Sequence, residues 1–474
     1  MAQTDGPAAP QLCGTYDGEG RGAWYAGDRP MQAGDLPVLV FVPGLGSPAS
    51  SYWQTGEYGP NRMYELAWRG GFRTAFTGFM KKGEKAQDMW HNGRIFAWQL
   101  EEICRYYGVE SVVVVCHSKG GVDAQTAVVY FGAAPRVRRL ITLSTPHWGS
   151  QLADIAYSTF GWPLARRLGV HSPGCYVMQT GYMREYRRLT DKSPAGGPPI
   201  LTTGGSGSAP PFTKIWAGSQ VMAPYGENDG VVTVKSAHNP RGEHMATLHF
   251  NHAQMQQGQH VWPFVEAMAL ELPLPAVPAM APAEAEPVPA GMILRGGTLG
   301  EPSPSSFWVD GGVDSMEISV MAAGEGTAGL AEGLSALGPG GRELRGFRAG
   351  EGFAGGTALQ LRVPHPAPGE WQIRLPEAAP GVPEGGYFAI VRFFGGAVPV
   401  PADLGGRLRS VMRVVRLFPD RYELVDEKRS DSGMLPELRL DEGVYNIETQ
   451  VSGRLPNGRP YERDSVRPLL IRRR

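Results

Sequence analysis

The sequence has no excess of charge of either sign and few cysteines for its length. Its 45 lysine and arginine residues nearly balance 46 aspartate and glutamate residues, which leaves a formal net charge of −1. This balance gives no electrostatic reason to expect nucleic acid, an acidic polymer or an anionic membrane as a partner. Four cysteines are too few for a disulfide framework, and no Cys-x-x-Cys pair indicates redox or metal chemistry. Whether Cys13 takes part in a single disulfide is left open by the sequence.

A long apolar run and a recognisable signal peptide are also missing. No stretch is long and apolar enough to span a bilayer, so no membrane span is expected. The first ten residues lack the basic-then-apolar pattern of a secretory signal. The chain therefore reads either as the mature form of an exported protein or as a cytoplasmic protein.

Apolar residues make up 42% of the 474 residues, which is enough to bury a sizeable core in two to four domains. The clearest boundary is residues 272–291, a Pro/Ala/Glu run containing six prolines. Such a run cannot continue a helix or donate a ladder of hydrogen bonds, and it tends to be extended. We predict a catalytic domain over residues 20–271, followed by a linker over residues 272–291.

Before the linker, strand-like apolar runs alternate with helical stretches. The predicted strands are Leu36–Val42, Ser111–Val115 and Arg139–Leu143, with a helix over Ile95–Tyr107 between the first two. Buried strands that alternate with helices predict a mainly parallel sheet covered on both faces, the α/β class.

After the linker the pattern changes to short alternating segments broken by glycine and proline. Six of them suit strands: Met316–Val320, Leu359–Val363, Trp371–Leu375, Tyr387–Phe393, Val411–Leu417 and Tyr445–Val451. Pro-Gly-Glu-Trp and Glu-Gly-Val-Tyr, which end at Trp371 and Tyr445, each put an aromatic just after a turn glycine. We predict two β-sandwich-like modules, residues 292–380 and 381–474, which meet between Pro376 and Gly386. One longer β-domain would give much the same pattern.

The most informative segment runs from Val112 to Gly121, Val-Val-Val-Val-Cys-His-Ser-Lys-Gly-Gly. A buried strand ends, Ser118 follows, and two glycines open a helix. This is the pattern of a sharp strand-to-helix turn that lifts a nucleophilic serine out of the sheet. The helix N-terminus favours an oxyanion near the backbone amide of Lys119. On the near side of the turn, Cys116 stands where a glycine is usual.

Three motifs together resemble bacterial lipases and esterases of the α/β-hydrolase superfamily. They are Cys116-His-Ser-Lys-Gly-Gly, the segment Ser144-Thr-Pro-His-Trp-Gly-Ser, and Tyr225-Gly-Glu-Asn-Asp-Gly-Val-Val. The first is similar to the Ala-His-Ser-Lys-Gly-Gly box of secreted Bacillus-type esterases, and the resemblance covers about residues 20 to 268. It implies an α/β-hydrolase fold, carboxylic ester hydrolysis and a secreted protein.

A serine hydroxyl needs a base to take its proton, and the base needs a carboxylate to orient it. In this fold the three residues follow one another along the chain in the order serine, acid, histidine. Asp229, in a Gly-Glu-Asn-Asp-Gly loop, is the counterpart of the family's acid, and Asp123 and Asp154 are weaker candidates. Five histidines follow it: His238, His244, His249, His252 and His260. Asn251-His252 matches the family's base, just before a final helix over Gln259–Leu270, and His260 is the second choice.

The loop Pro43-Gly-Leu-Gly-Ser follows the first central strand, where the family places its second oxyanion donor. The resemblance implies that the backbone amide of Leu45 pairs with that of Lys119. No Gly-Lys-Ser/Thr follows the loop, so nucleotide binding is not expected. His147 precedes Asp229 and is expected to shape the floor of the site. Residues 151–200, rich in aromatic and apolar side chains, are expected to form a cap-like insertion.

No cofactor or metal is expected. The spacing of the five histidines fits no zinc pattern. Some related lipases bind calcium through an aspartate two residues after the base, but Gln254 occupies that position here.

The sequence therefore predicts a serine esterase or lipase, with Ser118, Asp229 and His252 as the catalytic residues. Its substrate would be a lipid, a small ester or a polyester. One alternative is a polyester depolymerase of the polyhydroxyalkanoate type whose β-modules hold insoluble substrate. A non-catalytic adhesion protein on a hydrolase scaffold is another. Amide or thioester cleavage uses the same residues, and the sequence does not fix the oligomeric state.

Overall fold

A computed structural model describes most of the chain. The described residues are 6–31, 34–56, 58–192, 197–277, 289–300, 305–324, 327, 329–350, 356–376, 385–395, 408–430, 438–455 and 458–472. Most of the predicted linker, residues 278–288, lies outside them. Within these ranges, no helix has the length and apolar character needed to cross a membrane.

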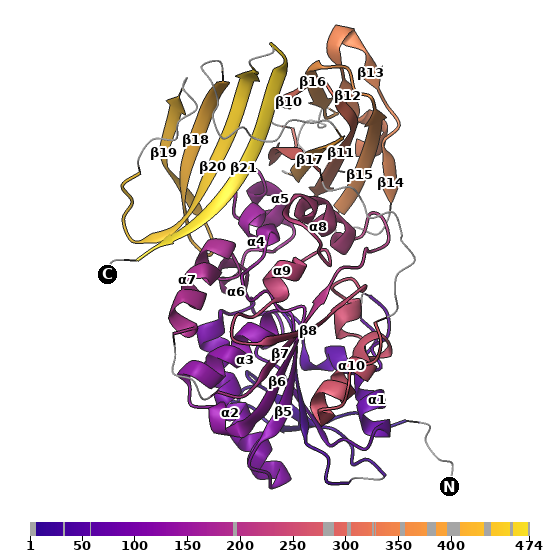
Figure 1. The fold of residues 1–474 in the computed structure, drawn as a ribbon, viewed down its shortest axis with the longest axis vertical. Coiled ribbons are helices and arrows are strands. Elements are labelled where there is room, and N and C mark those ends of the chain that lie inside the picture. Colours follow the sequence, from indigo (N-terminus) through magenta and orange to yellow (C-terminus); the bar gives the residue numbers. More distant parts are fainter. Residues whose placement is uncertain are drawn as a thin grey trace.

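The N-terminal half is built on a sheet of eight strands in the order β1-β2-β4-β3-β5-β6-β7-β8 (Figure 1). The six strands β4, β3, β5, β6, β7 and β8 run parallel to one another, while β1 and β2 form an antiparallel edge. The strands are β1 (Gln11–Gly14), β2 (Trp24–Ala26), β3 (Leu39–Val42), β4 (Thr74–Thr77), β5 (Val112–His117), β6 (Val137–Leu143), β7 (Ile200–Gly205) and β8 (Glu243–Leu248).

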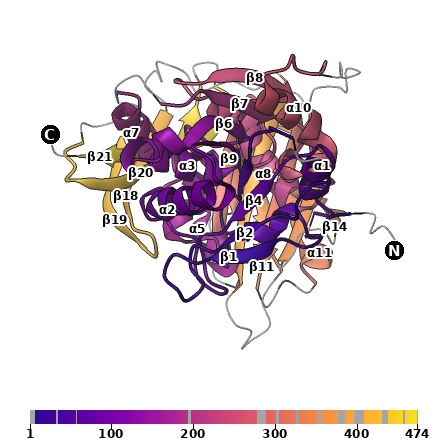
Figure 2. The ribbon, with the colours of Figure 1, turned by 90° about the horizontal axis from the view of Figure 1, so that it is seen from below.

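Helices cover both faces of this sheet, because successive side chains of a buried strand point to opposite sides. Leu39 and Phe41 pack with α1 (Met63–Arg69) and α10 (Gly258–Leu270). Val40 and Val42 pack with α2 (Met89–Tyr107) and α3 (Lys119–Tyr130) on the other face. Seen from below, α2 and α3 lie apart from α1 and α10 (Figure 2). The predicted mainly parallel sheet with two covered faces is confirmed.

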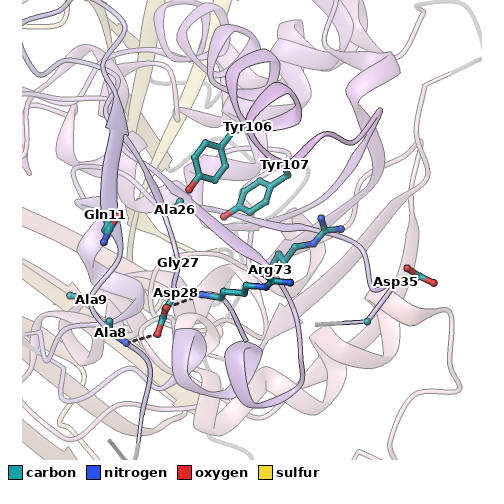
Figure 3. A pocket seen from close by; sticks show the side chains of 12 residues that line it. Ala8, Ala9, Gln11, Ala26, Gly27, Asp28, Asp35, Arg73, Tyr106 and Tyr107 are labelled. Atoms are coloured by element: carbon teal, nitrogen blue, oxygen red, sulfur yellow. Dashed lines mark hydrogen bonds between the residues drawn. The ribbon is translucent and has the colours of Figure 1, made fainter. Parts of the chain in front are cut away.

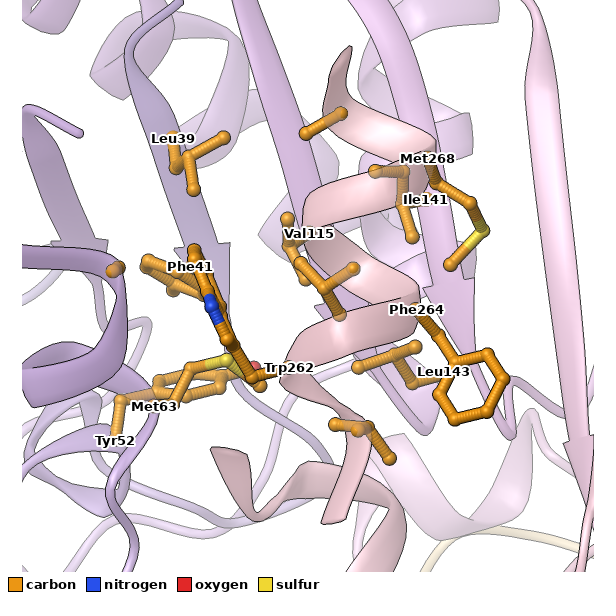
Figure 4. Close-up of a cluster of buried hydrophobic side chains, with 14 of the residues drawn as sticks. Leu39, Phe41, Tyr52, Met63, Val115, Ile141, Leu143, Trp262, Phe264 and Met268 are labelled. Carbon is orange, nitrogen blue, oxygen red and sulfur yellow. The ribbon is translucent and has the colours of Figure 1, made fainter. Parts of the chain in front are cut away.

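The α10 face holds the larger aromatic cluster (Figure 4). Trp262 and Phe264 of α10 lie against Phe41 and Leu143 of the strands, all at most 7% exposed. This cluster fixes α10 on the sheet, and with it the segment just before α10, which carries His252.

Six further helices connect the later strands of the described chain. They are α4 (Gln151–Ala156), α5 (Trp162–Arg167), α6 (Pro173–Tyr176), α7 (Thr180–Thr190), α8 (Lys214–Met222) and α9 (Val234–Ala237). In Figure 1, α4, α5 and α8 lie between the eight-stranded sheet and the C-terminal strands. The segment predicted as a cap thus consists of short helices at the end of the sheet that faces the C-terminal half.

The first part of the C-terminal half is a sandwich of two antiparallel sheets. One sheet has the order β10-β16-β12-β13 and the other β14-β15-β11-β17-β9, and their inner faces share one apolar cluster. The strands are β9 (Gly291–Thr298), β10 (Ser306–Val309), β11 (Val313–Ala323), β12 (Ser335–Leu337), β13 (Glu343–Leu344), β14 (Arg348–Gly350), β15 (Gly356–Pro364), β16 (Gly369–Arg374) and β17 (Gly386–Gly395). A short helix, α11 (Leu330–Gly333), lies between β11 and β12.

The last part is a single antiparallel sheet in the order β19-β18-β20-β21. Its strands are β18 (Leu408–Leu417), β19 (Tyr422–Ser430), β20 (Gly443–Arg454) and β21 (Pro460–Ile471). Two buried arginine clusters join it to the sandwich: Arg295 of β9 with Glu462 and Asp464, and Arg463 with Asp310. The C-terminal half therefore consists of antiparallel β-domains, as the sequence predicts.

One predicted boundary needs correction. The sequence places the strand over Tyr387–Phe393 after the break at 376–386, in the second module. In the structure β17 hydrogen-bonds to β9 and β11 and belongs to the first sandwich. Strand pairing between distant segments decides this, and it leaves no trace in local composition. The division of the chain into domains otherwise remains a prediction, since residues 377–384 and 396–407 lie outside the described ranges.

The two similar turn segments adopt the same local structure. The Trp371 indole donates to the carbonyl of Ala367 at 2.9 Å, and the Tyr445 hydroxyl donates to that of Asp441 at 3.1 Å. Each bond spans four residues and closes over a turn glycine with positive φ. The aromatic ring thus fixes the corner by which β16 and β20 each begin.

Candidate active site

Ser118 sits on a strained turn at the carboxyl end of β5. Its φ of 53° and ψ of −135° lie in a region that residues other than glycine rarely adopt. Its amide donates to the carbonyl of Leu143 at 3.0 Å, which ties the turn to the neighbouring strand β6. Backbone strain of this kind persists only where the surroundings enforce it, and here it places the hydroxyl at the N-terminus of α3.

The two glycines after Ser118 are needed for space. A Cβ on Gly120 would lie 2.5 Å from the carbonyl oxygen of Pro43, and one on Gly121 would lie 2.2 Å from Thr145 Oγ1. The loop after β3 approaches equally closely, since a Cβ on Gly44 would lie 2.9 Å from the Cβ of Ser118. Helix α3 can therefore start against the loop after β3 only because these positions carry no side chain. Cys116 is fully buried on the near side.

Ser118, His252 and Asp229 form one chain of hydrogen bonds. His252 Nε2 lies 3.0 Å from Ser118 Oγ, and His252 Nδ1 lies 2.8 Å from Asp229 Oδ2. Asp229 is fully buried, and its other oxygen accepts the amides of Val231 and Val232 at 2.9 and 2.7 Å. The chain of contacts runs from a buried, hydrogen-bonded carboxylate through an imidazole to the strained serine.

The fold brings these residues together from three separate loops. Ser118 follows β5 directly, and His252 lies in the loop between β8 and α10. Asp229 lies in the long connection from β7 to β8, yet a Cβ on Gly205 at the end of β7 would lie 2.9 Å from the Asp229 Cβ. Because β5, β7 and β8 run parallel, their carboxyl ends meet at one edge, where ligands of such sheets bind.

The alternative acids lie elsewhere. Asp123 pairs with Lys119 Nζ at 2.5 Å and with Asn92, and Asp154 accepts from the amide and hydroxyl of Thr180 at 2.8 Å. Neither contacts a histidine.

The alternative bases do not reach Ser118 either. The rings of His238 and His244 stack on each other at 3.6 Å, His249 is exposed, and His260 packs against Phe250. His147 is buried, with its ring nitrogens beside Thr142 and Asn239.

Sequence reasoning gave no role to His117, which supports the loop of His252. Burial holds the pKa of His117 well below its usual value, so the imidazole is neutral. Its Nε2–H donates to the backbone carbonyl of His252 at 2.9 Å, and the two rings lie 4.6 Å apart. The available signal was its place directly before the serine, at the end of a buried strand.

Two backbone amides near Ser118 are available as donors. In the described part of the chain, neither the amide of Leu45 nor that of Lys119 donates to another protein group. Both residues line the same cavity as Ser118. Lys119 is the first residue of α3, so its amide lies at the positive end of the helix dipole.

Ser118, His252 and Leu45 line a cavity of about 700 Å³, a size typical of small-molecule sites. The polar side of its lining consists of Ser50, Ser51, Gln54, Thr55, Tyr58, Asn61, Gln256 and Gln257. The apolar side consists of residues of α4, α5 and α8, with Met321 and Phe388 of the β-sandwich. Helices of the predicted cap thus lie directly on the cavity that holds the serine.

A second cavity of about 520 Å³ lies beside β1 and β2 (Figure 3). It is lined by Asp28, Arg73, Tyr106 and Tyr107 among others, and it contains none of the predicted site residues. Among the described residues, no group of three or more His, Cys, Asp or Glu side chains is gathered as metal ligands. All four cysteines are free thiols, three of them buried, so the disulfide left open by the sequence is not formed.

The PGAP1-like alpha/beta domain family matches residues 97–160, which contain β5 and Ser118. Among curated proteins, none matches the sequence.

Two solved structures of one bacterial enzyme are similar to the chain. A crystal structure of Bacillus licheniformis lipase BlEst2 in propeptide form superposes with a TM-score of 0.78 at 26% identity, over 94% of this chain and 97% of that one. The mature form of the same lipase is 35% identical and covers 52% of this chain and 97% of its own, with a TM-score of 0.48.

Proposed function

Because this chain belongs to the lipases and esterases of the α/β-hydrolase fold, we propose that it is a serine carboxylesterase with Ser118 as nucleophile. The hydrogen-bonded series from Ser118 through His252 to Asp229, at 3.0 and 2.8 Å, carries the proposal. Distances of this kind let an imidazole take the hydroxyl proton while a buried carboxylate holds its other nitrogen.

The reaction proceeds by acyl transfer. Ser118 Oγ attacks the ester carbonyl as its proton moves to His252 Nε2, and the amides of Leu45 and Lys119 bind the oxyanion. The tetrahedral intermediate then expels the alcohol, which takes the proton from His252. Water attacks the acyl-enzyme by the same steps and releases the acid. Asp229 keeps His252 in the tautomer that presents a bare Nε2 to the serine.

A fluorophosphonate probe and a para-nitrophenyl ester test this proposal together. Wild type should hydrolyse the ester and become labelled on Ser118, and Ser118→Ala should lose both while keeping its unfolding temperature. Ser144→Ala is the matched control, because Ser144 is also buried with a positive φ of 48°, at the end of the neighbouring strand. Full turnover by Ser118→Ala, or no turnover by wild type on esters of any chain length, would refute the esterase proposal.

A second proposal concerns the C-terminal half. The relative that covers 94% of this chain is named a lipase in propeptide form, and every proposed catalytic residue here precedes residue 271. We propose that the β-domains correspond to a propeptide, removable by cleavage in the Pro/Ala-rich segment 272–291. Limited proteolysis followed by mass spectrometry should give a stable fragment of residues up to about this segment that still labels with the probe. If the fragment no longer labels with the probe after cleavage, the propeptide proposal is wrong.

The polyester and adhesion alternatives make different predictions in the same assays. A depolymerase would act on polyester film and lose that activity, but not small-ester turnover, without residues 292–474. An adhesion protein would fail to label at all. Docking of the β-sandwich on the cavity supports a role close to the reaction rather than at a distant polymer surface.

A further inference from the structure

The five-stranded sheet of the β-sandwich is apolar on both faces. On β17, Tyr387, Ala389 and Val391 point into the sandwich core, whereas Phe388 and Ile390 point the other way. The second face packs on apolar side chains of α4, α5 and α8, which include Ile155, Leu164, Ile215 and Val221. This face of the sheet is therefore built to lie against the hydrolase helices.

Close backbone contacts and a hydrogen bond from the buried Arg392 hold the two parts together. Gly386 lies so near α5 that a Cβ there would be 2.3 Å from the carbonyl of Pro163. Arg392 of β17 pairs with Glu317 of β11 at 2.5 Å and also donates to Gln220 of α8. The sheet is thus fixed in position against α5 and α8.

Two side chains of this face reach the cavity of Ser118. Met321 of β11 and Phe388 of β17, both only 3% exposed, line the cavity. Leu164 and Val221 of the hydrolase helices line it beside them. More than two hundred residues separate Met321 and Phe388 from the serine in the sequence. The apolar side of the cavity is consequently completed by the β-sandwich and not by the hydrolase domain alone.

We propose that Met321 and Phe388 are specificity-determining residues that end the acyl-binding side of the cavity and limit the length of the acyl chain. The inference rests on the proposed esterase function and concerns the full chain, from which the β-domains have not been cleaved. The apolar side suits the alkyl chain of a fatty acyl ester, and the polar side suits the alcohol. Each methylene that enters the apolar side raises kcat/KM roughly fourfold until the chain meets the wall.

The test is a series of para-nitrophenyl esters from acetate to palmitate, with kcat/KM measured for wild type, Met321→Ala and Phe388→Ala. Met292→Ala is the matched control, because Met292 is buried on the same face of the same sheet but does not line the cavity. Thermal unfolding of each variant accompanies the kinetics. The readout is the ratio of kcat/KM for dodecanoate to that for butyrate, which is independent of the amount of folded enzyme.

Wild type should reach its maximum at a medium chain length. Phe388→Ala and Met321→Ala should shift the maximum to longer chains and raise the ratio by about sixteenfold, as two more buried methylenes at roughly fourfold each would. Met292→Ala should keep the wild-type profile. A profile unchanged in both cavity variants, with esters still hydrolysed, would overturn this inference alone. Absence of ester hydrolysis by wild type would instead overturn the function on which it rests.

Discussion

Replacing Asp229 by asparagine keeps the shape of the side chain and changes only its hydrogen bonding. Asp229 is fully buried, with one oxygen bonded to the amides of Val231 and Val232 and the other to His252 Nδ1. An asparagine can keep the two backbone bonds only with its oxygen on that side. Its NH2 group then faces the protonated Nδ1 of His252, and two N–H donors cannot form a hydrogen bond with each other.

His252 would resolve this conflict by moving its proton from Nδ1 to Nε2. Nε2 could then no longer accept the proton of Ser118 Oγ, 3.0 Å away. The wrong tautomer of a triad histidine lowers kcat by about four orders of magnitude. That factor corresponds to about 5.5 kcal/mol of transition-state stabilisation. The fold should be little affected, because the asparagine still satisfies both buried amides.

The assay is kcat/KM for para-nitrophenyl butyrate, with the unfolding temperature as the measure of folding. Asp154→Asn is the control, since Asp154 is an equally buried carboxylate that contacts Thr180 and no histidine. It should hydrolyse the ester within a few-fold of wild type. If Asp229→Asn keeps a tenth or more of the wild-type activity, or if Asp154→Asn loses as much, the assigned role of Asp229 is wrong.

Three further predictions concern the fold around the site. Gly120→Ala should abolish hydrolysis and lower the unfolding temperature, because its Cβ would lie 2.5 Å from the carbonyl oxygen of Pro43. Gly197→Ala is the control and should change neither measurement, because the atom nearest to its Cβ would lie 3.8 Å away. Burial raises the pKa of Asp154 to about 7 from its ordinary value of 3.8, so the folded state favours its protonated form. Ionisation then destabilises the fold progressively as the pH rises from about 4 to 7, by on the order of 4 kcal/mol in all. Asp154→Asn should therefore be more stable than wild type at pH 8 in urea unfolding and equal to it near pH 4, and an equal difference at both pH values would contradict this. Arg392→Met should cost about 1 to 3 kcal/mol of unfolding free energy, because it removes the hydrogen bonds of a buried guanidinium to Glu317 and Gln220. A loss below about 0.5 kcal/mol in the same assay would show that Arg392 does not hold the β-sandwich on α8.

Much of the site could be predicted from local sequence because its constraints are local. Four consecutive valines, then Ser118 and two glycines, predict a buried strand, a sharp turn and a helix, and the structure has each of them. The steric reason is visible in the contacts that a Cβ at Gly120 or Gly121 would make. The choice of His252 among five histidines came instead from the resemblance to the lipase and esterase family, and that histidine lies within hydrogen-bond distance of Ser118 and Asp229.

The C-terminal half shows where sequence reasoning fails. All six strands predicted there are present, but the sequence prediction places the strand over Tyr387–Phe393 in the wrong module. Its run Tyr-Phe-Ala-Ile-Val-Arg-Phe-Phe is apolar at almost every position, which is typical of a strand buried on both faces. That signal could have predicted a covered second face, although not what covers it.

The sequence by itself thus determined the α/β class, the turn at Ser118 and the change to β structure after the proline-rich segment. These features depend on residues a few positions apart, whose sizes and backbone preferences act directly on one another. The candidate acid Asp229 and base His252 follow from the family resemblance, because no local pattern joins them to Ser118. Only the tertiary structure decided that His117 supports the loop of His252, that β17 joins β9 and β11, and that Met321 and Phe388 line the cavity. Those contacts join segments more than a hundred residues apart or depend on how two packed surfaces fit, and no local pattern in the chain encodes that fit.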